Sequence, residues 1–414
     1  MHILYIHQYF LTNDQIGGTR SYDLARYLIA NGHKVTIVSG NINPQTGQPI
    51  TPSRGRLFTK EIIEGIEVVR IALPFAYHGS LWQRVALFIG FMGLSSLFGL
   101  IVSHPDIIYA TSTPITVGVP ALITHLFRRV PFVFEVRDLW PDFPIEYGVL
   151  KNPLLIGVAY FAEYLFYRFS THIVTTSPGM AGRIVQKGVP HNKVTCVPIG
   201  ADIELFHPEL ASASIWRQKL DIDGGTLICL YAGSLSQVFD LDTLVDAAKV
   251  LEEMEIDNVK ILIVGDGGAK EQLVNKATDL GLSNLYFLPP IPRRQLGPLL
   301  ASADICVTTN KDVPAARAFF QNKLFDYLAS GKPVLVNFPG DTADLLTSTG
   351  SGIVVRAEDP QALADAIRDL STNRPLLQRM GARARQVAEQ RFNRRVLYQS
   401  LVNIIESIAA SSQA

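Results

Sequence analysis

The chain has 414 residues, of which 48% are hydrophobic, and this fraction indicates globular domains with large cores rather than a disordered polypeptide. Because Lys plus Arg and Asp plus Glu both number 37, the net charge is zero, which argues against a general nucleic-acid-binding protein. The length allows two domains of ordinary size. The three cysteines lie in apolar, strand-like runs without metal-ligand spacing, so we expect reduced core residues of a cytosolic protein at Cys196, Cys229 and Cys306.

Short apolar runs alternate with helix-length segments along the chain, as is typical of parallel sheets covered by helices on both faces. In the first half we expect strands at 3–6, 35–38, 68–71, 107–109, 132–136, 172–175 and 194–197. In the second half we expect them at 227–231, 261–264, 285–287, 305–307, 334–336 and 352–355. The pattern predicts an α/β fold with two doubly wound, Rossmann-like domains, residues 1–200 and 201–392, and a last amphipathic helix in 393–414.

The segment 85–103 contains no charged residue and is long enough to approach a membrane span. A predicted strand follows almost at once at 107–109, so a spanning helix would break the N-terminal sheet. The alternatives are a core helix and a helix that touches the membrane surface, with Trp82 and Arg84 at its start. A second apolar helix at 154–169 carries three tyrosines that suit the same surface, although core packing explains them equally well.

Two glycine-containing turns join predicted strands to helices. The turn after the first strand contains Gly17 and Gly18 and leads into Arg20. Glycines there let backbone N–H groups approach a phosphate or sugar, and a helix N-terminus favours anions. The spacing differs from the dinucleotide-binding fingerprint, and a tight turn without a ligand is the alternative. In the second half, the turn with Gly265 and Gly267 also joins a predicted strand to a helix start. It could lie near a nucleotide, and a simple turn without a ligand is again the alternative.

The segment 320–334 combines a cation, an acid, an apolar helix face and a glycine that can end a helix. Lys323 and Asp326 are three residues apart and therefore share one face of the helix. Gly331 suits the position after the helix, and a predicted strand follows. One cation and one anion near the helix start would suit the phosphate and ribose of a nucleotide. An exposed ion pair on an amphipathic helix is the alternative.

This segment resembles the donor-binding helix of the family 4 glycosyltransferases of the GT-B fold, in which an acidic residue grips the ribose of a nucleotide-sugar. Segments 17–33, 134–141 and 197–208 agree with the same family in order and spacing, so the resemblance covers nearly the whole chain. The segment 134–141 is similar to a subgroup, including fucosaminyltransferases, that builds bacterial surface polysaccharides. The resemblance implies two domains that face each other across a cleft, with 393–414 returning to the N-terminal domain.

The resemblance also implies roles for individual residues. The N-terminal domain would bind the acceptor, and Arg137 and Asp138 would steady the departing phosphate or orient a sugar hydroxyl, with a structural ion pair as the alternative. In the second domain Lys323 would act on the diphosphate and Asp326 on the ribose. The other donor-binding positions implied in this way are Gly17, Gly18, Arg20, Gly233, Ser234, Gly265, Gly267, Ile291 and Leu324.

Two departures from the family pattern affect these expectations. Many members place an arginine and a lysine as diphosphate clamps where this chain has Ser234 and Phe239. The usual pair of acids eight residues apart is incomplete, because Ala318 stands eight residues before Asp326. The diphosphate charge must then be met elsewhere, with Lys323 as the best candidate, followed by Arg317, Arg20 and the helix N-termini. Alternatively, the site is degenerate and does not turn over.

The sequence therefore predicts a retaining hexosyl- or N-acetylhexosaminyltransferase of cell-surface polysaccharide synthesis. It would move an N-acetylated hexosamine or fucosamine from a UDP-sugar to a lipid-linked or glycan acceptor. We expect neither a metal nor a cofactor, and a cytoplasmic protein peripherally associated with the inner face of the membrane. Two alternatives remain: a nucleotide-sugar epimerase on the same architecture, and a non-catalytic nucleotide- or glycan-binding partner in an assembly complex.

Overall fold

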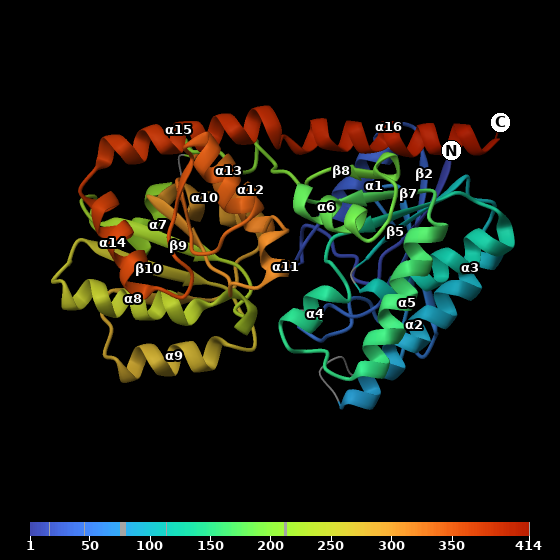
Figure 1. Ribbon diagram of the computed structural model, residues 1–414, viewed down its shortest axis with the longest axis horizontal. Helices are drawn as coiled ribbons and strands as arrows, with labels where there is room; N and C mark the ends of the chain where they lie inside the picture. Colours follow the sequence, from blue (N-terminus) through green and yellow to red (C-terminus); the bar gives the residue numbers. More distant parts are fainter. Residues whose placement is uncertain (16, 45, 75–79, 113, 211–212, 414) are drawn as a thin grey trace. The chain divides into compact units, whose positions relative to one another are not determined.

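Two β-sheets organise the chain in the computed structural model, which describes residues 1–413 except 16, 45, 75–79, 113 and 211–212. The sheets belong to two compact units (Figure 1). The N-terminal unit comprises Met1–Val197 and Tyr398–Ala414, and the C-terminal unit comprises Pro198–Leu397. The predicted α/β class with two doubly wound sheets is confirmed.

The sheet of the N-terminal unit has the strand order β3-β4-β2-β1-β5-β6-β7-β8, and every neighbouring pair except β3 and β4 is parallel. Its strands are β1 (His2–Ile6), β2 (Lys34–Gly40), β3 (Phe58–Ile63), β4 (Ile66–Ile71), β5 (Ile107–Thr111), β6 (Phe132–Val136), β7 (His172–Thr175) and β8 (Val194–Cys196). All seven predicted strands are present. The edge strand β3 was missed because its residues are only partly buried and give no continuous apolar run.

The β3–β4 hairpin turns through Glu64 and Gly65, both of which have positive φ (48° and 84°). Positive φ at both turn residues is the signature of the two-residue hairpin that matches the twist of the strands. The Glu64-Gly65 pair is therefore the feature of the sequence from which this hairpin could have been predicted.

Helices cover both faces of the N-terminal sheet (Figure 1). They are α1 (Arg20–Ala30), α2 (Leu81–Ile101), α3 (Gly118–Arg128), α4 (Asp142–Glu146), α5 (Pro153–Phe169), α6 (Pro178–Gln186) and α16 (Arg394–Gln413), with single turns η1 (Ile115–Val117) and η2 (His191–Lys193). Helix α3 packs between α2 and α5, whereas α16 contacts α1 through the rings of Tyr27 and Tyr398.

The C-terminal sheet is parallel throughout, in the order β11-β10-β9-β12-β13-β14. Its strands are β9 (Leu227–Ala232), β10 (Val259–Val264), β11 (Leu285–Leu288), β12 (Ile305–Thr308), β13 (Val334–Val336) and β14 (Gly352–Val354). All six predicted strands are present. Two of the cysteines, Cys229 and Cys306, are buried in this unit as predicted, whereas Cys196 of the other unit is only partly buried.

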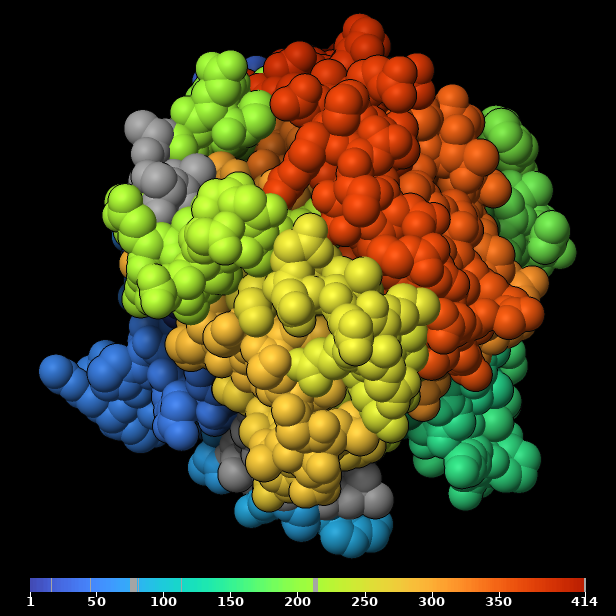
Figure 2. Space-filling model, turned by 90° about the vertical axis from the view of Figure 1, so that its left-hand side faces the viewer, coloured from blue at the N-terminus to red at the C-terminus, as the bar shows by residue number. Residues whose placement is uncertain are grey.

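The helices of the C-terminal unit lie on both faces of its sheet. They are α7 (Ala213–Lys219), α8 (Leu241–Glu253), α9 (Lys270–Asp279), α10 (Arg293–Ser302), α11 (Pro314–Arg317), α12 (Asn322–Ala329), α13 (Asp341–Thr349), α14 (Pro360–Ser371) and α15 (Arg374–Arg391), with one turn of 3-10 helix, η3 (Gln237–Phe239). Figure 2 shows the yellow surface of α8 and α9 beside the red surface of α14, in agreement with the packing of α8 on α14.

In each sheet, successive strands are first added toward one edge and then toward the other, and the strand order shows where this change occurs. In the N-terminal sheet this point lies between β1 and β5, and in the C-terminal sheet it lies between β9 and β12. The loops after such a pair of strands diverge, so the carboxyl ends of these strands are where doubly wound sheets bind ligands. These two places are the candidate sites.

Within the part of the chain that is described, one helix, α2, is long and apolar enough to cross a membrane, judged by length and composition. The window Trp82–Ile101 has a mean hydropathy of 1.8, and 33% of it is buried. Helix α2 connects β4 to β5, two strands of one sheet, so its two ends are tied to that sheet.

Candidate functional site

The side chain of Lys323 lies at the carboxyl end of β9, between two aromatic rings. Its Nζ is 3.7 Å from the ring centroid of Tyr231 and 4.3 Å from that of Phe239. This Nζ is buried and has no hydrogen-bond partner among the described residues. Burial holds the pKa of Lys323 well below its ordinary value. An amine buried without a counter-charge is costly, which makes this position a candidate anion site.

Gly233 makes room for this amine. A Cβ at position 233 would lie 2.8 Å from both Cε and Nζ of Lys323, closer than carbon atoms approach one another. The glycine that begins the loop after β9 therefore lets the end of the Lys323 side chain lie where it does, and a larger residue would make that end shift. Sequence reasoning named both Gly233 and Lys323 but gave no reason to join them.

Phe239 accounts for one departure from the family pattern. The resemblance places a clamp cation at this position, and the aromatic ring that stands there instead covers the ammonium of Lys323. Aromatic faces attract cations. The ring of Phe239 carries no charge, but it can hold the ammonium of Lys323 in position. Ser234, the other clamp position, uses its backbone carbonyl to accept a hydrogen bond from the Tyr231 hydroxyl at 2.8 Å.

Asp326 faces a different partner from Lys323, although both belong to α12. Its two carboxylate oxygens accept hydrogen bonds from the Arg293 guanidinium at 2.9 and 2.8 Å. The Asp326 side chain is 7% exposed and that of Arg293 is 18% exposed. The guanidinium also lies 4.8 Å from the ring centroid of Phe206. The alternative of an exposed ion pair between Lys323 and Asp326 is therefore wrong, and Arg293 is a partner that sequence reasoning missed.

Gly265 and Gly267 hold the loop after β10 against the loop after β9. Both have positive φ, 152° and 154°. A Cβ at 265 would collide with the carbonyl oxygen of Gly233, and one at 267 with that of Leu235. The Leu235 N–H also donates to the Asp266 carbonyl at 2.9 Å. The glycines are needed for this close approach, whereas their direct contact with a donor stays a prediction.

Gly267→Ala should destabilise the C-terminal unit by about 2 kcal/mol, because a Cβ meets backbone in a conformation that L-residues rarely adopt. Gly268→Ala is the matched control, since nothing lies within 4 Å of a Cβ at that position. The control should change stability by less than about 0.5 kcal/mol. Urea unfolding of both variants measures the difference, and equal effects would contradict the steric account.

Two other predicted donor residues lie in the C-terminal unit. Leu324 is a correction: its side chain is fully buried in the core, and its N–H donates to the Gln321 carbonyl at 3.0 Å. The apolar stripe of α12 that packs on the sheet includes this side chain, so the side chain cannot reach a donor, and a contact through the backbone of Leu324 stays a prediction. Ile291 is partly buried against the same core, in the loop before α10.

In the N-terminal unit, Arg20 is also a correction. Its side chain is buried and forms an ion pair with Glu135 of β6, at 2.7 Å. It also donates to the Val197 carbonyl at 3.1 Å. Arg20 thus ties α1 to the centre of the sheet, and its charge is already matched. Sequence reasoning missed Glu135 because an acid within an apolar strand gives no sign of its partner.

Arg137 lies beside the glycine turn after β1. A Cβ at Gly18 would be 3.6 Å from a terminal nitrogen of its guanidinium. The Arg137 N–H donates to Ser112 Oγ, after β5, at 3.2 Å. The structure therefore brings together Gly18 and Arg137 at the point where the N-terminal sheet reverses. Ile16 of the same turn lies outside the described residues.

Asp138 is part of a tight turn. Its carbonyl accepts a hydrogen bond from the Trp140 N–H at 2.9 Å, and the Trp140–Pro141 peptide bond is cis.

Among the described residues, no three His, Cys, Asp or Glu side chains are grouped to hold a metal ion.

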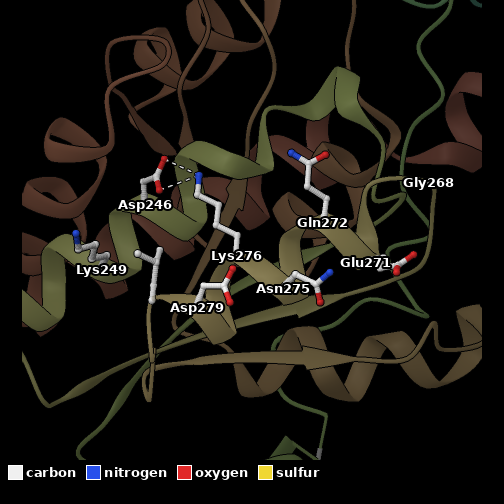
Figure 3. Close-up of a pocket in the computed structure, with 9 residues that line it drawn as sticks. Asp246, Lys249, Gly268, Glu271, Gln272, Asn275, Lys276 and Asp279 are labelled. Carbon is white, nitrogen blue, oxygen red and sulfur yellow. Dashed lines mark hydrogen bonds and ion pairs between the residues drawn. The ribbon is translucent and has the colours of Figure 1, made fainter.

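A surface groove between α8 and α9 (Figure 3) offers a contrast with Lys323. Lys276 of α9 reaches toward α8, where its Nζ lies 2.8 Å from Asp246 and 3.3 Å from Asp242. Because the ammonium of Lys276 is already paired with two carboxylates, it is not available to an anion, and we assign no ligand to this groove.

Comparisons with known proteins agree with this geometry. Residues 17–200 match the family model "Glycosyl transferase 4-like domain", and residues 212–387 match "Glycosyl transferases group 1". A protein of Escherichia coli K12 described as the colanic acid biosynthesis glycosyl transferase WcaI is 26% identical over 406 residues, covering 94% of this chain and 95% of the relative. A D-inositol 3-phosphate glycosyltransferase of Nocardia farcinica is 29% identical over 204 residues, 48% of this chain and 44% of the relative.

Solved structures share the fold at low identity. Sucrose-phosphate synthase from Thermosynechococcus elongatus superposes with a TM-score of 0.78 at 17% identity, over 99% of both chains. HepE of Anabaena, in complex with UDP-glucose, has a TM-score of 0.74 at 20% identity, over 98% of this chain and 100% of that chain. The predicted resemblance is confirmed: the chain belongs to the glycosyltransferases of the GT-B fold, with a family-4-like domain followed by a group 1 domain.

Proposed function

We propose that this glycosyltransferase transfers a sugar from a UDP-linked donor to a lipid-linked saccharide in the synthesis of a bacterial cell-surface polysaccharide. The observation that carries the proposal is the buried Nζ of Lys323 at the carboxyl end of β9, which has no hydrogen-bond partner in the described part of the chain. Support for the polysaccharide comes from the full-length similarity to WcaI, and support for UDP from the fold shared with HepE. The narrower proposal for the sugar is an N-acetylated hexosamine or fucosamine.

The proposed reaction retains the configuration at the anomeric carbon. The bond from C1 to the diphosphate oxygen breaks, the acceptor oxygen bonds to C1 on the same face, and the leaving phosphate oxygen takes the acceptor proton. Negative charge develops on the phosphate, and a cation already in position stabilises it without reorganisation. Lys323 is placed to supply this cation, because a diphosphate beside its Nζ would raise the lowered pKa.

A second candidate function is suggested by Ser234 and Phe239, which stand where many relatives have clamp cations. A protein of this kind would bind nucleotide or glycan in an assembly complex without catalysing transfer. The two candidates differ in donor turnover: the enzyme releases UDP from a UDP-sugar, whereas the binding protein does not. An epimerase would convert the donor sugar in the absence of any acceptor.

Thermal unfolding with UDP, GDP or ADP tests the donor class. A nucleotide at about one hundred times its dissociation constant should stabilise the protein by about 2.7 kcal/mol. We expect stabilisation by UDP alone, followed by UDP release when the matching UDP-sugar is supplied. Stabilisation by GDP or ADP instead would overturn the UDP assignment, and binding of UDP without release from any UDP-sugar would favour the binding protein.

We also propose that helices α2, α3 and α5 of the N-terminal unit rest on the cytoplasmic face of the membrane, where a lipid-linked acceptor is found. These helices expose many large apolar side chains, among them Trp82, Ile89, Leu97, Phe127, Leu154, Phe161 and Tyr164. The three sequences contain one acid, Glu163, which is buried and paired with Lys187. Exposed Arg84 and Arg168 leave the surface apolar and basic, as anionic lipid requires.

Co-sedimentation with vesicles tests the membrane proposal. The protein should bind vesicles that contain anionic lipid, and Phe161→Glu, at a side chain that is 62% exposed, should reduce binding at least about tenfold. Ile215→Glu, at an exposed apolar side chain of the C-terminal unit, is the matched control. Binding that is equal for both variants, or absent for the wild type, would refute the proposal.

A further inference from the structure

The turn η3, at the end of the loop after β9, carries the ring of Phe239 over Lys323, and residues that follow β12 anchor its backbone. The Phe239 carbonyl accepts a hydrogen bond from the hydroxyl of Thr309. The Val238 carbonyl, on the other side of the same residue, accepts one from the Lys311 N–H at 3.2 Å. Because Thr309 is fully buried, the ring is attached to the core of the C-terminal unit through its own backbone.

Asp240, the residue after Phe239, ties the turn to a second strand. Its backbone lies in the left-handed region, with φ 45° and ψ 46°, which aspartate, asparagine and glycine adopt more readily than other residues. Its Oδ2 accepts hydrogen bonds from Thr243 Oγ1 and from Asn337 Nδ2, both at 2.8 Å. Because Asp240 is 9% exposed, these bonds lie inside the protein, where water competes little for them.

Asn337, which directly follows β13 and is fully buried, joins Asp240 to the rest of the sheet. Its Oδ1 accepts a hydrogen bond from the Asn310 N–H at 2.9 Å. A backbone N–H can only donate, so the amide oxygen of Asn337 faces Asn310 and its nitrogen faces Asp240. The Asn337 side chain is therefore a bridge of fixed orientation from the ends of β12 and β13 to the turn that carries Phe239.

The position of the Phe239 ring decides whether water reaches the amine of Lys323. Phe239 itself is only partly buried, whereas the Nζ that it covers is buried. The amine also meets the ring of Tyr231, whose hydroxyl is turned to the Ser234 carbonyl. Desolvation by burial, with no charged group beside it in the described part of the chain, keeps the pKa of Lys323 well below its ordinary value. A displaced ring would readmit water and let this pKa rise.

We propose that Asp240 and Asn337 are positioning residues for donor binding: the hydrogen bond between them holds the Phe239 ring over Lys323 and fixes the place of the amine that meets the diphosphate. This inference rests on the proposed glycosyltransferase function and names two residues for it that sequence reasoning did not find. Both act through Phe239, and neither takes part in a bond-breaking step. A group that is in place before the donor arrives needs no reorganisation when charge develops on the leaving phosphate.

Nitrogen-15 NMR of the full-length, lysine-labelled protein tests the bridge without any donor. The Nζ signal of Lys323, assigned by its loss in Lys323→Met, gives the pKa of the amine from its change with pH. Asp240→Gly keeps the left-handed backbone but removes the hydrogen bond to Asn337, so this pKa should rise toward that of ordinary lysines. Loss of the Asp240 carboxyl as a charge would lower the pKa of a nearby amine, so a rise reports the displaced ring. Phe239→Ala, which removes the ring itself, should give the same rise.

Asp240→Asn is the matched control. Asparagine tolerates the same backbone conformation, and its side-chain oxygen can accept from Asn337, so the pKa of Lys323 should stay at the wild-type value. Asn337→Ala breaks the bridge from the β13 side and should raise the pKa as Asp240→Gly does. The proposal is overturned if Phe239→Ala alone raises the pKa, because the ring would then keep its place without the bridge. An unchanged pKa in Phe239→Ala would also overturn it, because the ring would then not shield the amine.

Donor kinetics connect the bridge to the proposed function. Asp240→Gly should raise the KM for the UDP-sugar about threefold to tenfold, the fold-change of one hydrogen bond, and Asp240→Asn should recover most of it. The acceptor KM should not change, because the N-terminal unit is the one expected to bind the acceptor, and both residues belong to the C-terminal unit. A loss of thermal stability with an unchanged donor KM would mean that the bridge is only structural. If the wild type turns over no donor, the proposed function fails, and the NMR result still decides whether the bridge positions the ring.

Discussion

Lys323→Met should strongly reduce sugar transfer and at the same time stabilise the C-terminal unit. Methionine matches the length of lysine without its amine, so it fills the space between Tyr231 and Phe239. The desolvation of a buried ammonium costs several kcal/mol, whereas cation–π contacts return about 2 kcal/mol. We therefore expect a gain of about 1 kcal/mol in the free energy of unfolding, with turnover about a hundredfold to a thousandfold lower.

Lys332→Met is the matched control for this experiment. Lys332 is another largely buried lysine of the same unit, but its Nζ donates to the Ala301 carbonyl at 2.8 Å. Its removal should cost about 1 kcal/mol and leave turnover unchanged. Urea unfolding and UDP release from a UDP-sugar measure both quantities. A Lys323→Met variant that is unstable and active would mean that the lysine is only a structural contact of the two rings.

The fold was largely predictable because buried parallel strands leave a strong signal. Each predicted strand is a short apolar run, and the helices between them have one apolar face. The exception, β3, lies at a sheet edge with partly exposed residues, so its sequence shows no such run. Pairing order was not predictable from these runs, and it is the order that locates β1 beside β5 and β9 beside β12.

The candidate sites were predictable as segments but not as contacts. Sequence reasoning placed Arg20 on a donor phosphate because it follows a glycine turn, yet Glu135, 115 residues away, pairs with it. Phe239 counted as a lost cation, although its ring covers Lys323. Spacing along the chain describes neighbours within one helix or turn, whereas these partners come from different strands and loops.

Asp326→Asn should destabilise the C-terminal unit by about 3 kcal/mol, since the change removes the carboxylate charge that pairs with the largely buried Arg293 guanidinium. For a unit of this size the melting temperature should fall by about 6–12 °C. Arg293→Met should lower the stability by a similar amount, because it removes the guanidinium that pairs with the buried Asp326 carboxylate. The double variant should be more stable than the sum of the two changes predicts, by about 1–3 kcal/mol, as expected for directly contacting partners.

The same variants separate two roles for Asp326. If the carboxylate also binds the ribose of the donor, UDP should stabilise Arg293→Met as it does the wild type, but should no longer stabilise Asp326→Asn. If the carboxylate serves only Arg293, UDP should stabilise both variants equally, relative to their own melting temperatures. Both carboxylate oxygens already accept from Arg293, so a ribose hydroxyl would have to share an oxygen with the guanidinium. A carboxylate oxygen has lone pairs for two donors, which makes such sharing chemically possible and the ribose role testable in the folded protein.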